Sequence, residues 1–123
     1  MDFPEVSIIV PTFRDADCLE LCLAALERQS YPADRYEEVV VNNCVEDDLQ
    51  PLVEQFEHVR LCVEAQPGSY AARNQGLAVA KAEVLAFTDA DCIPAEDWLE
   101  QGVQHLLSVE NCGLVAGSIR VFV

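Results

Sequence analysis

Val6-Ser7-Ile8-Ile9-Val10 is a short β-branched run that Pro11 closes, and it predicts a buried strand near the start of the chain. Three later apolar runs predict further strands, at residues 39–41, 59–63 and 83–88. Residues 113–123 return to a strand pattern. The first run therefore predicts the beginning of a sheet that the rest of the chain extends.

Segments with helical patterns separate these strands. Asp17 followed by Glu20 resembles a capping box, and leucines then recur at helical spacing until Ser30-Tyr31-Pro32. Further helices are expected at residues 47–56, with Pro51 in the first turn, at 69–81, with Ser69 as a cap, and at 98–107. Strands that alternate with helices predict an α/β fold on a mostly parallel central sheet.

Polar clusters follow three of the predicted strands, at residues 12–14, 42–43 and 89–91. In open α/β sheets, ligands bind outside the carboxyl ends of the strands. The coincidence of these clusters with strand ends is the strongest fold-level indication of a binding site.

Composition narrows the class of protein. The 123 residues predict a single compact domain, and the 51% that are hydrophobic suffice for one core. Asp and Glu number 22 against 7 Lys and Arg, so the formal net charge is −15, which argues against nucleic acid as a partner. No apolar run approaches the roughly 20 residues of a membrane span, and the N-terminus lacks the basic start of a signal peptide. A cytoplasmic domain is expected.

The six cysteines show no Cys-x-x-Cys pair, and zinc-ligand spacing is absent. Most of them lie in apolar runs, which predicts small, reduced core residues. Cys18 and Cys22 are four residues apart and would share one helix face.

Asp89-Ala90-Asp91 follows the apolar strand Val84-Leu85-Ala86-Phe87. Two carboxylates two residues apart can point to the same side, and their mutual repulsion is relieved by a cation such as Mg²⁺ or Mn²⁺. The alternative is a turn whose Asp residues cap the following helix.

Arg73 lies in an Ala-rich predicted helix beside a Gly break. One interpretation is an internal ion pair, and the other is a contact to a phosphate or to the Asp pair. His58 and His105 are isolated, and a G-x-S-x-G nucleophile context, a phosphate loop and a G-x-G-x-x-G fingerprint are all missing from the sequence.

Three linked segments resemble the family 2 glycosyltransferases, which have the GT-A fold, a Rossmann-like α/β/α sandwich. They are residues 6–13 (VSIIVPTF), 72–76 (ARNQG) and 85–92 (LAFTDADC). Their order and spacing match the family, and the resemblance covers nearly the whole chain. Three linked segments are far more specific than a lone Asp-x-Asp.

The resemblance implies a role for each matching residue. The nucleotide-sugar site would consist of Pro11, Thr12, Phe13, Arg14, Asn42, Arg73, Asp89 and Ala90. Asp91, together with Asp89, would hold a divalent metal, Mn²⁺ or Mg²⁺, that bridges the diphosphate. Asn42 stands where the family usually has an Asp that faces the base, and Arg14 stands where it usually has Asn. Both departures bear on the identity of the base more than on the fold.

The implied reaction is transfer of a sugar, with inversion, from a nucleoside-diphosphate sugar to an acceptor sugar, lipid or protein. A metal at the diphosphate stabilises the charge that develops on the leaving phosphate. The family's general base lies downstream in the acceptor-binding half, and the sequence offers no counterpart before Val123. We therefore expect residues 1–123 to be one nucleotide-sugar-binding domain, truncated inside a larger protein that reaches a membrane face through other regions or partners.

Two other functions are compatible with parts of the pattern. A nucleotide-sugar-binding module without catalysis would keep the same site residues. A phosphate-handling regulator similar to receiver domains needs an Asp pair near the first strand, where this chain has Pro11-Thr12-Phe13 instead.

Overall fold

The computed structural model describes residues 5–109, 113 and 115. Four parallel strands form its sheet in the order β3-β2-β1-β4. The strands are β1 (Val6–Thr12), β2 (Tyr36–Asn42), β3 (Val59–Val63) and β4 (Val84–Phe87). The helices are α1 (Ala16–Glu27), the 3₁₀ helix η1 (Ala33–Arg35), α2 (Gln50–Val53), α3 (Ser69–Val79) and α4 (Trp98–Ser108).

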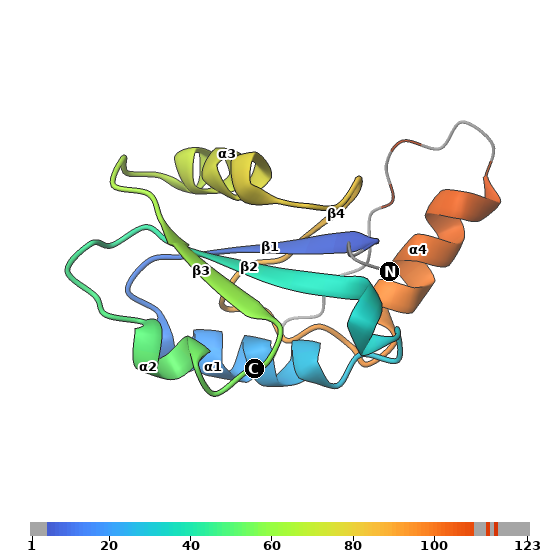
Figure 1. The fold of residues 1–123 in the computed structure, drawn as a ribbon, viewed down its shortest axis with the longest axis horizontal. Helices are drawn as coiled ribbons and strands as arrows, with labels where there is room; N and C mark the ends of the chain where they lie inside the picture. Colours follow the sequence, from blue (N-terminus) through green and yellow to red (C-terminus); the bar gives the residue numbers. More distant parts are fainter. Residues whose placement is uncertain (1–4, 110–112, 114, 116–123) are drawn as a thin grey trace.

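Helices cover both faces of the sheet, and α3 lies opposite α1 and α2 (Figure 1). This arrangement is the α/β/α fold with a parallel sheet that the alternating pattern predicts. All residues of β1 and β2 are buried, because both strands lie inside the sheet and are covered above and below. None of the helices described is long and apolar enough to cross a membrane.

Neighbouring residues of β1 serve two different cores. Ile8 packs with α1, α2 and α4 in the larger core, whereas Ile9 packs with Val39, Val41 and Ala72 under α3. This division follows from the two-residue period of a strand, which sends successive side chains to opposite faces. The larger core also takes in Ala90, from the turn after β4.

Several predicted boundaries are wrong. The helix α1 begins at Ala16, so Asp17 lies in its first turn and is not the cap. The helix α2 covers only Gln50–Val53. It begins later than predicted because the side chain of Asn42 holds the preceding loop by accepting from Cys44 N and donating to Asp47 O. The helix α3 follows Gly68, so Ser69 is its first residue and not its cap.

The other predicted elements are close to the observed ones. The expected β3 and α4 agree with the structure to within one residue, and α3 ends at Val79 instead of residue 81. The strand β2 begins at Tyr36, three residues before its predicted start, because Glu37 and Glu38 are buried inside the sheet although both are acidic residues. Most of the strand expected at 113–123 lies outside the described residues.

The burial of cysteines is only partly as predicted. Cys22 and Cys44 are buried, whereas Cys18, Cys62 and Cys92 are partly exposed. All five are free thiols, and Cys112 lies outside the described residues. A cysteine in or near an apolar run is thus not always a core residue, since a strand at the sheet edge or a turn leaves one side open.

The helix α3 lies so close to the sheet that Gly76 has no space for a side chain. A Cβ at this position would lie 2.5 Å from Ile9 Cγ2 and 3.3 Å from Val41 Cγ2. Gly102 of α4 has nothing within 4 Å of the same hypothetical atom. The two glycines therefore differ in packing, although both are inside helices.

We predict that Gly76→Ala destabilises the protein by about 1–3 kcal/mol, because a methyl group overpacks the contact between α3 and the sheet. Gly102→Ala is the matched control, and it should stabilise by about 0.5–1 kcal/mol, since alanine loses less backbone entropy in a helix. Urea unfolding of both variants measures the difference. Equal effects would mean that α3 does not approach β1 this closely.

Two adjacent carboxylates of β2 have opposite surroundings. Glu37 accepts hydrogen bonds from Ser7 Oγ, Arg60 Nε and Lys81 N, which tie β1, β3 and the segment after α3 to β2. Burial opposes its ionisation, but these bonds outweigh burial and lower its pKa below 4.5.

Glu38 points to the opposite face and is fully buried. No donor among the described residues reaches either of its carboxylate oxygens. Burial, and then the neighbouring Glu27, raises its pKa from 4.5 to about 8. Glu38 is therefore protonated at neutral pH in the folded protein.

We predict that the unfolding free energy of the wild type falls as pH rises from about 4.5 to 8. The folded state holds the Glu38 proton that the unfolded state releases, and the slope for one proton is at most about 1.4 kcal/mol per pH unit. Glu38→Gln should flatten this fall.

Glu37→Gln is the matched control, because the pKa of Glu37 is shifted in the opposite direction. It should lose stability at neutral pH and approach the wild type as pH falls below 4.5. Denaturant midpoints across pH test both, and parallel pH profiles for Glu38→Gln and wild type would refute the assignment.

Candidate functional site

The carboxyl ends of the strands meet at one edge of the sheet, and the predicted polar clusters lie there. The strand β1 ends at Thr12, whose carbonyl accepts from Asn43 N at 2.9 Å, directly after β2. On the other side of β1, the chain leaves β4 with Thr88 N donating to Ile9 O at 3.2 Å. The parallel register therefore brings the turn at Asp89–Asp91 beside the end of β1, which separates it from β2.

The turn after β4 presents Asp89 and Asp91 to solvent and buries Ala90 between them. Ala90 is 4% exposed and belongs to the larger core, so the small residue anchors the turn while the carboxylates on either side point outward. Cys92 N donates to Asp89 O at 3.0 Å and closes the turn. The spacing Asp-Ala-Asp thus has a packing reason as well as a chemical one.

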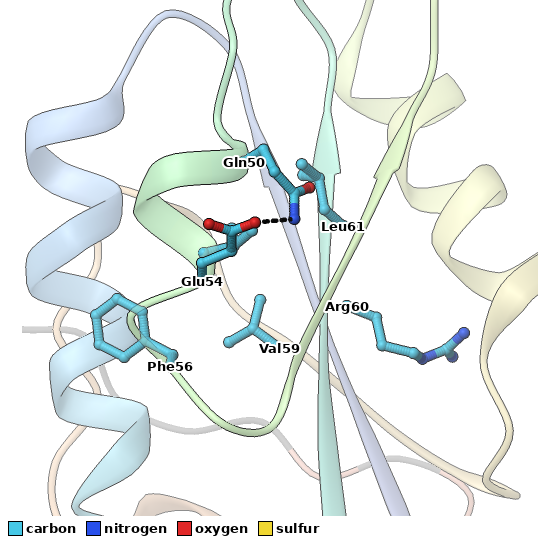
Figure 2. A pocket seen from close by; sticks show the side chains of 7 residues that line it. Gln50, Glu54, Phe56, Val59, Arg60 and Leu61 are labelled. Carbon is cyan, nitrogen blue, oxygen red and sulfur yellow. Dashed lines mark hydrogen bonds between the residues drawn. The ribbon is translucent and has the colours of Figure 1, made fainter.

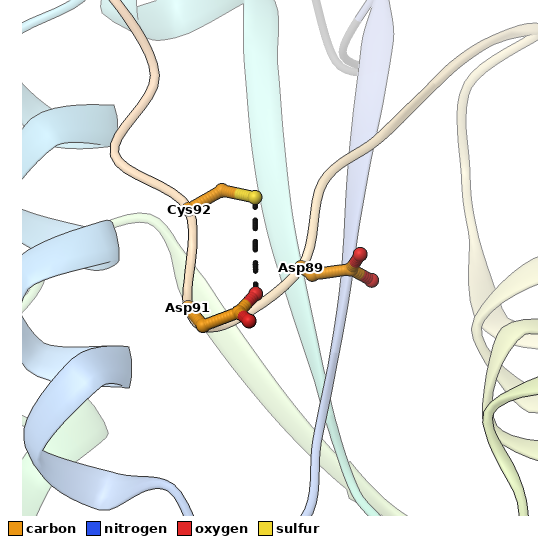
Figure 3. A group of neighbouring side chains, drawn as sticks. All are labelled: Asp89, Asp91 and Cys92. Carbon is orange, nitrogen blue, oxygen red and sulfur yellow. Dashed lines mark hydrogen bonds between the residues drawn. The ribbon is translucent and has the colours of Figure 1, made fainter. Parts of the chain in front are cut away.

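Figure 3 shows Asp89, Asp91 and Cys92 from this turn. One ligand atom from each, two carboxylate oxygens and a thiol sulfur, lies within 4.8 Å of the other two. Cys92 Sγ donates to Asp91 Oδ1 at 3.8 Å. Carboxylate oxygens suit the hard cations Mg²⁺ and Mn²⁺, which also accept water and phosphate oxygens to complete their coordination. The donor set fits a divalent cation that shares its coordination with a ligand.

Arg73 reaches this group from the second turn of α3. Its Nη2 lies 3.4 Å from Asp89 Oδ1, and its Nη1 donates to Ser69 Oγ at 3.5 Å. The side chains of Arg73 and Asp89 are 42% and 55% exposed. An ion pair this open contributes little to stability, so its placement matters more for a ligand than for the fold.

The turn is also held from the opposite side of the sheet. Cys22 of α1 is fully buried, and its thiol donates to Asp89 O at 3.6 Å. Burial, and then the nearby Cys92, raises the pKa of Cys22 to about 12, so the thiol keeps its proton.

Arg14 lies in a different part of the edge. Its φ of 52° is left-handed, which is uncommon for a residue other than glycine, and its guanidinium lies 5.1 Å from the Phe13 ring centre. A hydrogen bond and charge interaction with Cys44, followed by Glu46 and Asp47, raise the pKa of Arg14. Arg14 therefore faces the loop between β2 and α2, where it lines an open acidic groove.

The remaining residues predicted for the nucleotide site differ in accessibility. Pro11 and Thr12 are buried at the end of β1, and Phe13 is 56% exposed. Asn42 is 3% exposed, and both ends of its amide are bonded to its own loop, at Cys44 N and Asp47 O. A contact between Asn42 and a base stays a prediction, and it would need the second amide hydrogen or the second lone pair.

The structure thus brings together Asp89, Asp91 and Arg73, as two separate sequence patterns suggested. Arg14 and Asn42 instead contact the loop that follows β2. The sequence reasoning gave no role in the site to Cys92 or Cys22, and it placed Asn43 in a polar cluster at a strand end without giving its side chain a role. Cys92 could have been found from its position directly after Asp91, whereas Cys22 has no signal beyond its helical spacing.

A hollow of about 450 Å³ lies between α2 and the edge strand β3 (Figure 2). Phe56, Val59 and Leu61 are among its lining, and Gln50 and Glu54 bond to each other at 3.0 Å along α2. Arg60 points away from these two side chains (Figure 2) and bonds Glu37 instead. The polar groups at this hollow are therefore engaged with one another or elsewhere.

The structure has a parallel α/β sheet with a carboxylate pair and an arginine at its carboxyl edge, the edge at which open α/β sheets bind their ligands. Residues 7–122 match Glycosyl transferase family 2. The chain belongs to this family.

Relatives agree with this assignment. The chain is 38% identical over 122 residues to the glycosyltransferase AglE of Haloferax volcanii, covering 95% of this chain and 40% of AglE. It is 32% identical over 117 residues to the hyaluronan synthase of Pasteurella multocida, covering 89% of this chain and 12% of that protein. The chain therefore spans well under half the length of these relatives.

Solved structures confirm the GT-A fold. The mannosyltransferase PcManGT of Pyrobaculum calidifontis, solved with GDP-Man and Mn²⁺, superposes with a TM-score of 0.74 at 34% identity, over 85% of this chain and 32% of PcManGT. TarS of S. aureus, solved with UDP-GlcNAc, has a TM-score of 0.74 at 23% identity, over 91% of this chain and 37% of TarS. The second likeness concerns the fold alone.

Proposed function

We propose that this chain is the nucleotide-sugar-binding part of a metal-dependent glycosyltransferase. In this proposal Asp91 and Asp89 hold Mn²⁺ or Mg²⁺, and the cation in turn binds the diphosphate of a nucleoside-diphosphate sugar. The observation that carries the proposal is the group of Asp89, Asp91 and Cys92 within 4.8 Å, next to Arg73 at the carboxyl edge of the sheet. The Mn²⁺ and GDP-Man in PcManGT support the same ligand classes here.

Each residue has a physical role in this proposal. Thr12 and Phe13, at the end of β1, border the nucleoside, and the backbone of Ala90 sets the spacing of the two carboxylates. Arg73 brings a positive charge that counters the phosphates and orients Asp89. A bound divalent cation supplies charge stabilisation to the departing diphosphate. The sugar is transferred with inversion to an acceptor sugar, lipid or protein, with the general base supplied outside residues 1–123.

A nucleotide-sugar-binding module without catalysis is the second candidate, because the described residues provide donor-binding groups but no assigned general base. Product formation by the chain, with UDP-GlcNAc or GDP-Man and a panel of sugar acceptors, distinguishes the two. Transfer at a rate above donor hydrolysis would establish an enzyme. Binding without transfer, by this chain and by a longer form spanning the length of AglE, would establish the module.

We predict that nucleoside-diphosphate binding depends on a divalent cation held by Asp91. Calorimetry with UDP and with GDP should show binding in Mn²⁺ that a chelator abolishes. Asp91→Asn removes the charge that holds the cation, so it should weaken Mn²⁺-dependent binding by at least about tenfold. Asp34→Asn makes the same change at an exposed position before β2, away from the carboxyl edge, and should leave binding unaltered. Affinity equal with and without Mn²⁺ would overturn the metal assignment.

We predict that Arg73 affects the nucleotide and the cation in opposite directions. Arg73→Gln should weaken nucleoside-diphosphate binding about tenfold or more, which is the scale of one charged hydrogen bond. It should not weaken, and should even strengthen, the binding of Mn²⁺ alone, because a positive charge next to Asp89 is removed. Arg28→Gln, on an exposed arginine that follows α1, is the matched control. If Arg73→Gln lowers only stability, the ion pair is structural.

A further inference from the structure

We infer that Asn43 is a positioning residue for nucleotide binding, an inference that rests on the proposed function. Asn43 is 8% exposed and follows the last residue of β2. It does not touch the carboxylate group at Asp89–Asp91. Its importance lies in joining the end of β1 to the loop that leads into α3.

The side chain of Asn43 bonds three backbone groups of one loop. Its Nδ2 donates to Glu64 O at 2.8 Å and to Gln66 O at 2.9 Å, and its Oδ1 accepts from Gly68 N at 3.0 Å. Both amide hydrogens are used, and the oxygen faces a donor. With its own N–H bonded to Thr12 O, Asn43 connects β1 to the whole segment between β3 and α3.

This connection continues to the carboxylates. Gly68 has a φ of 112°, which only glycine adopts easily, and α3 begins at the next residue, Ser69. Ser69 Oγ accepts from Arg73, and Arg73 pairs with Asp89 Oδ1. Asn43 therefore sets where α3 starts relative to β1, and through α3 it sets where Arg73 meets Asp89.

The chemistry requires a carboxamide at this position. An aspartate would place a second acceptor oxygen against the carbonyls of Glu64 and Gln66, so two attractive contacts would become repulsive. The bond from Gly68 N would survive the change. Asn43→Asp should therefore release the first part of the loop while leaving the size of the side chain unchanged.

Gln29 offers an unusually close control. It is 9% exposed, donates to Ala25 O and Ala95 O, and accepts from Leu99 N, so its amide also makes two donor bonds and one acceptor bond. It joins the end of α1 to the start of α4, and it has no contact with the loop before α3. Gln29→Glu thus makes the same chemical change at a similar burial but outside the proposed connection.

The experiment compares wild type, Asn43→Asp and Gln29→Glu by calorimetry with UDP and GDP in Mn²⁺, and by hydrogen exchange at the Glu64 amide, which donates to Asn42 O in the first part of the loop. We expect Asn43→Asp to weaken nucleotide binding at least tenfold and to speed exchange at this amide. Binding of Mn²⁺ alone should change by less than threefold. Gln29→Glu should lower stability to a similar extent and leave nucleotide affinity within threefold of wild type. Asn43→Ser, which keeps an acceptor and one donor, should recover part of the affinity.

Three results would overturn the inference. The first is that Asn43→Asp binds nucleotide as tightly as the wild type. The second is that Gln29→Glu loses as much affinity as Asn43→Asp, because equal losses would show a general effect of lower stability. If Asn43→Asp does not fold, Gly68→Ala takes its place, because an added Cβ meets nothing within 4 Å and acts only through the unfavourable φ. Unchanged affinity in Gly68→Ala would then refute the connection.

Failure of the proposed function is distinguishable from these results. If the wild type binds neither UDP nor GDP, the function is wrong, and exchange at the Glu64 amide still reports whether Asn43 holds the loop. If the wild type binds nucleotide, and Asn43→Asp and Gln29→Glu have the same nucleotide affinity as each other, only the inference about Asn43 is wrong.

Discussion

The structure depends on the burial of β1 between two neighbouring strands and two layers of helices. All seven of its residues are buried, and it pairs in parallel with β2 on one side and β4 on the other. Because its side chains alternate between two cores, β1 aligns α1 and α3 on opposite faces of the same sheet. The end of β1 at Thr12 consequently lies between the two neighbouring parts of the candidate site: Asn43 bonds to Thr12 on one side, and the turn after β4 lies on the other.

The strand β2 shows how buried polar groups at its two ends serve different purposes. Near its start, Glu37 is stabilised as a carboxylate by Ser7, Arg60 and a backbone N–H, and this network joins three strands. Glu38, one residue away, has no such donors among the described residues and is protonated instead. Past the carboxyl end, Asn43 is neutral and uses its whole amide to shape a loop. Charge is retained only where donors are already arranged for it.

The chain belongs to glycosyltransferase family 2, and the described residues place a carboxylate pair and Arg73 beside the end of β1. In the proposed function, this edge binds a cation and a diphosphate. The chain spans 40% of AglE and 32% of PcManGT, so much of each longer protein has no counterpart in it. The acceptor and the general base of this protein therefore remain part of the proposed function.

The sequence by itself determined the fold class, the positions of the four described strands and the carboxylate pair. Apolar β-branched runs at regular intervals specify buried strands locally, and the spacing of Asp89 and Asp91 around a small residue is a local property too. The caps of α1 and α3 and the length of α2 were wrong. At α2, the Asn42 side chain holds the loop after β2, so the helix begins only at Gln50.

Only the tertiary structure decided which partner each polar side chain has. Arg73 could have paired with many of the carboxylates in so acidic a chain, and the packing of α3 against β1 selects Asp89. At the carboxyl edge, Asn43 meets residues 64–68. On the other face of the sheet, the packing of α1 brings Cys22 to Asp89 O, and Glu38 has no donor among the residues described. These outcomes depend on distances between segments far apart in the chain, and such distances follow from packing, not from local sequence patterns.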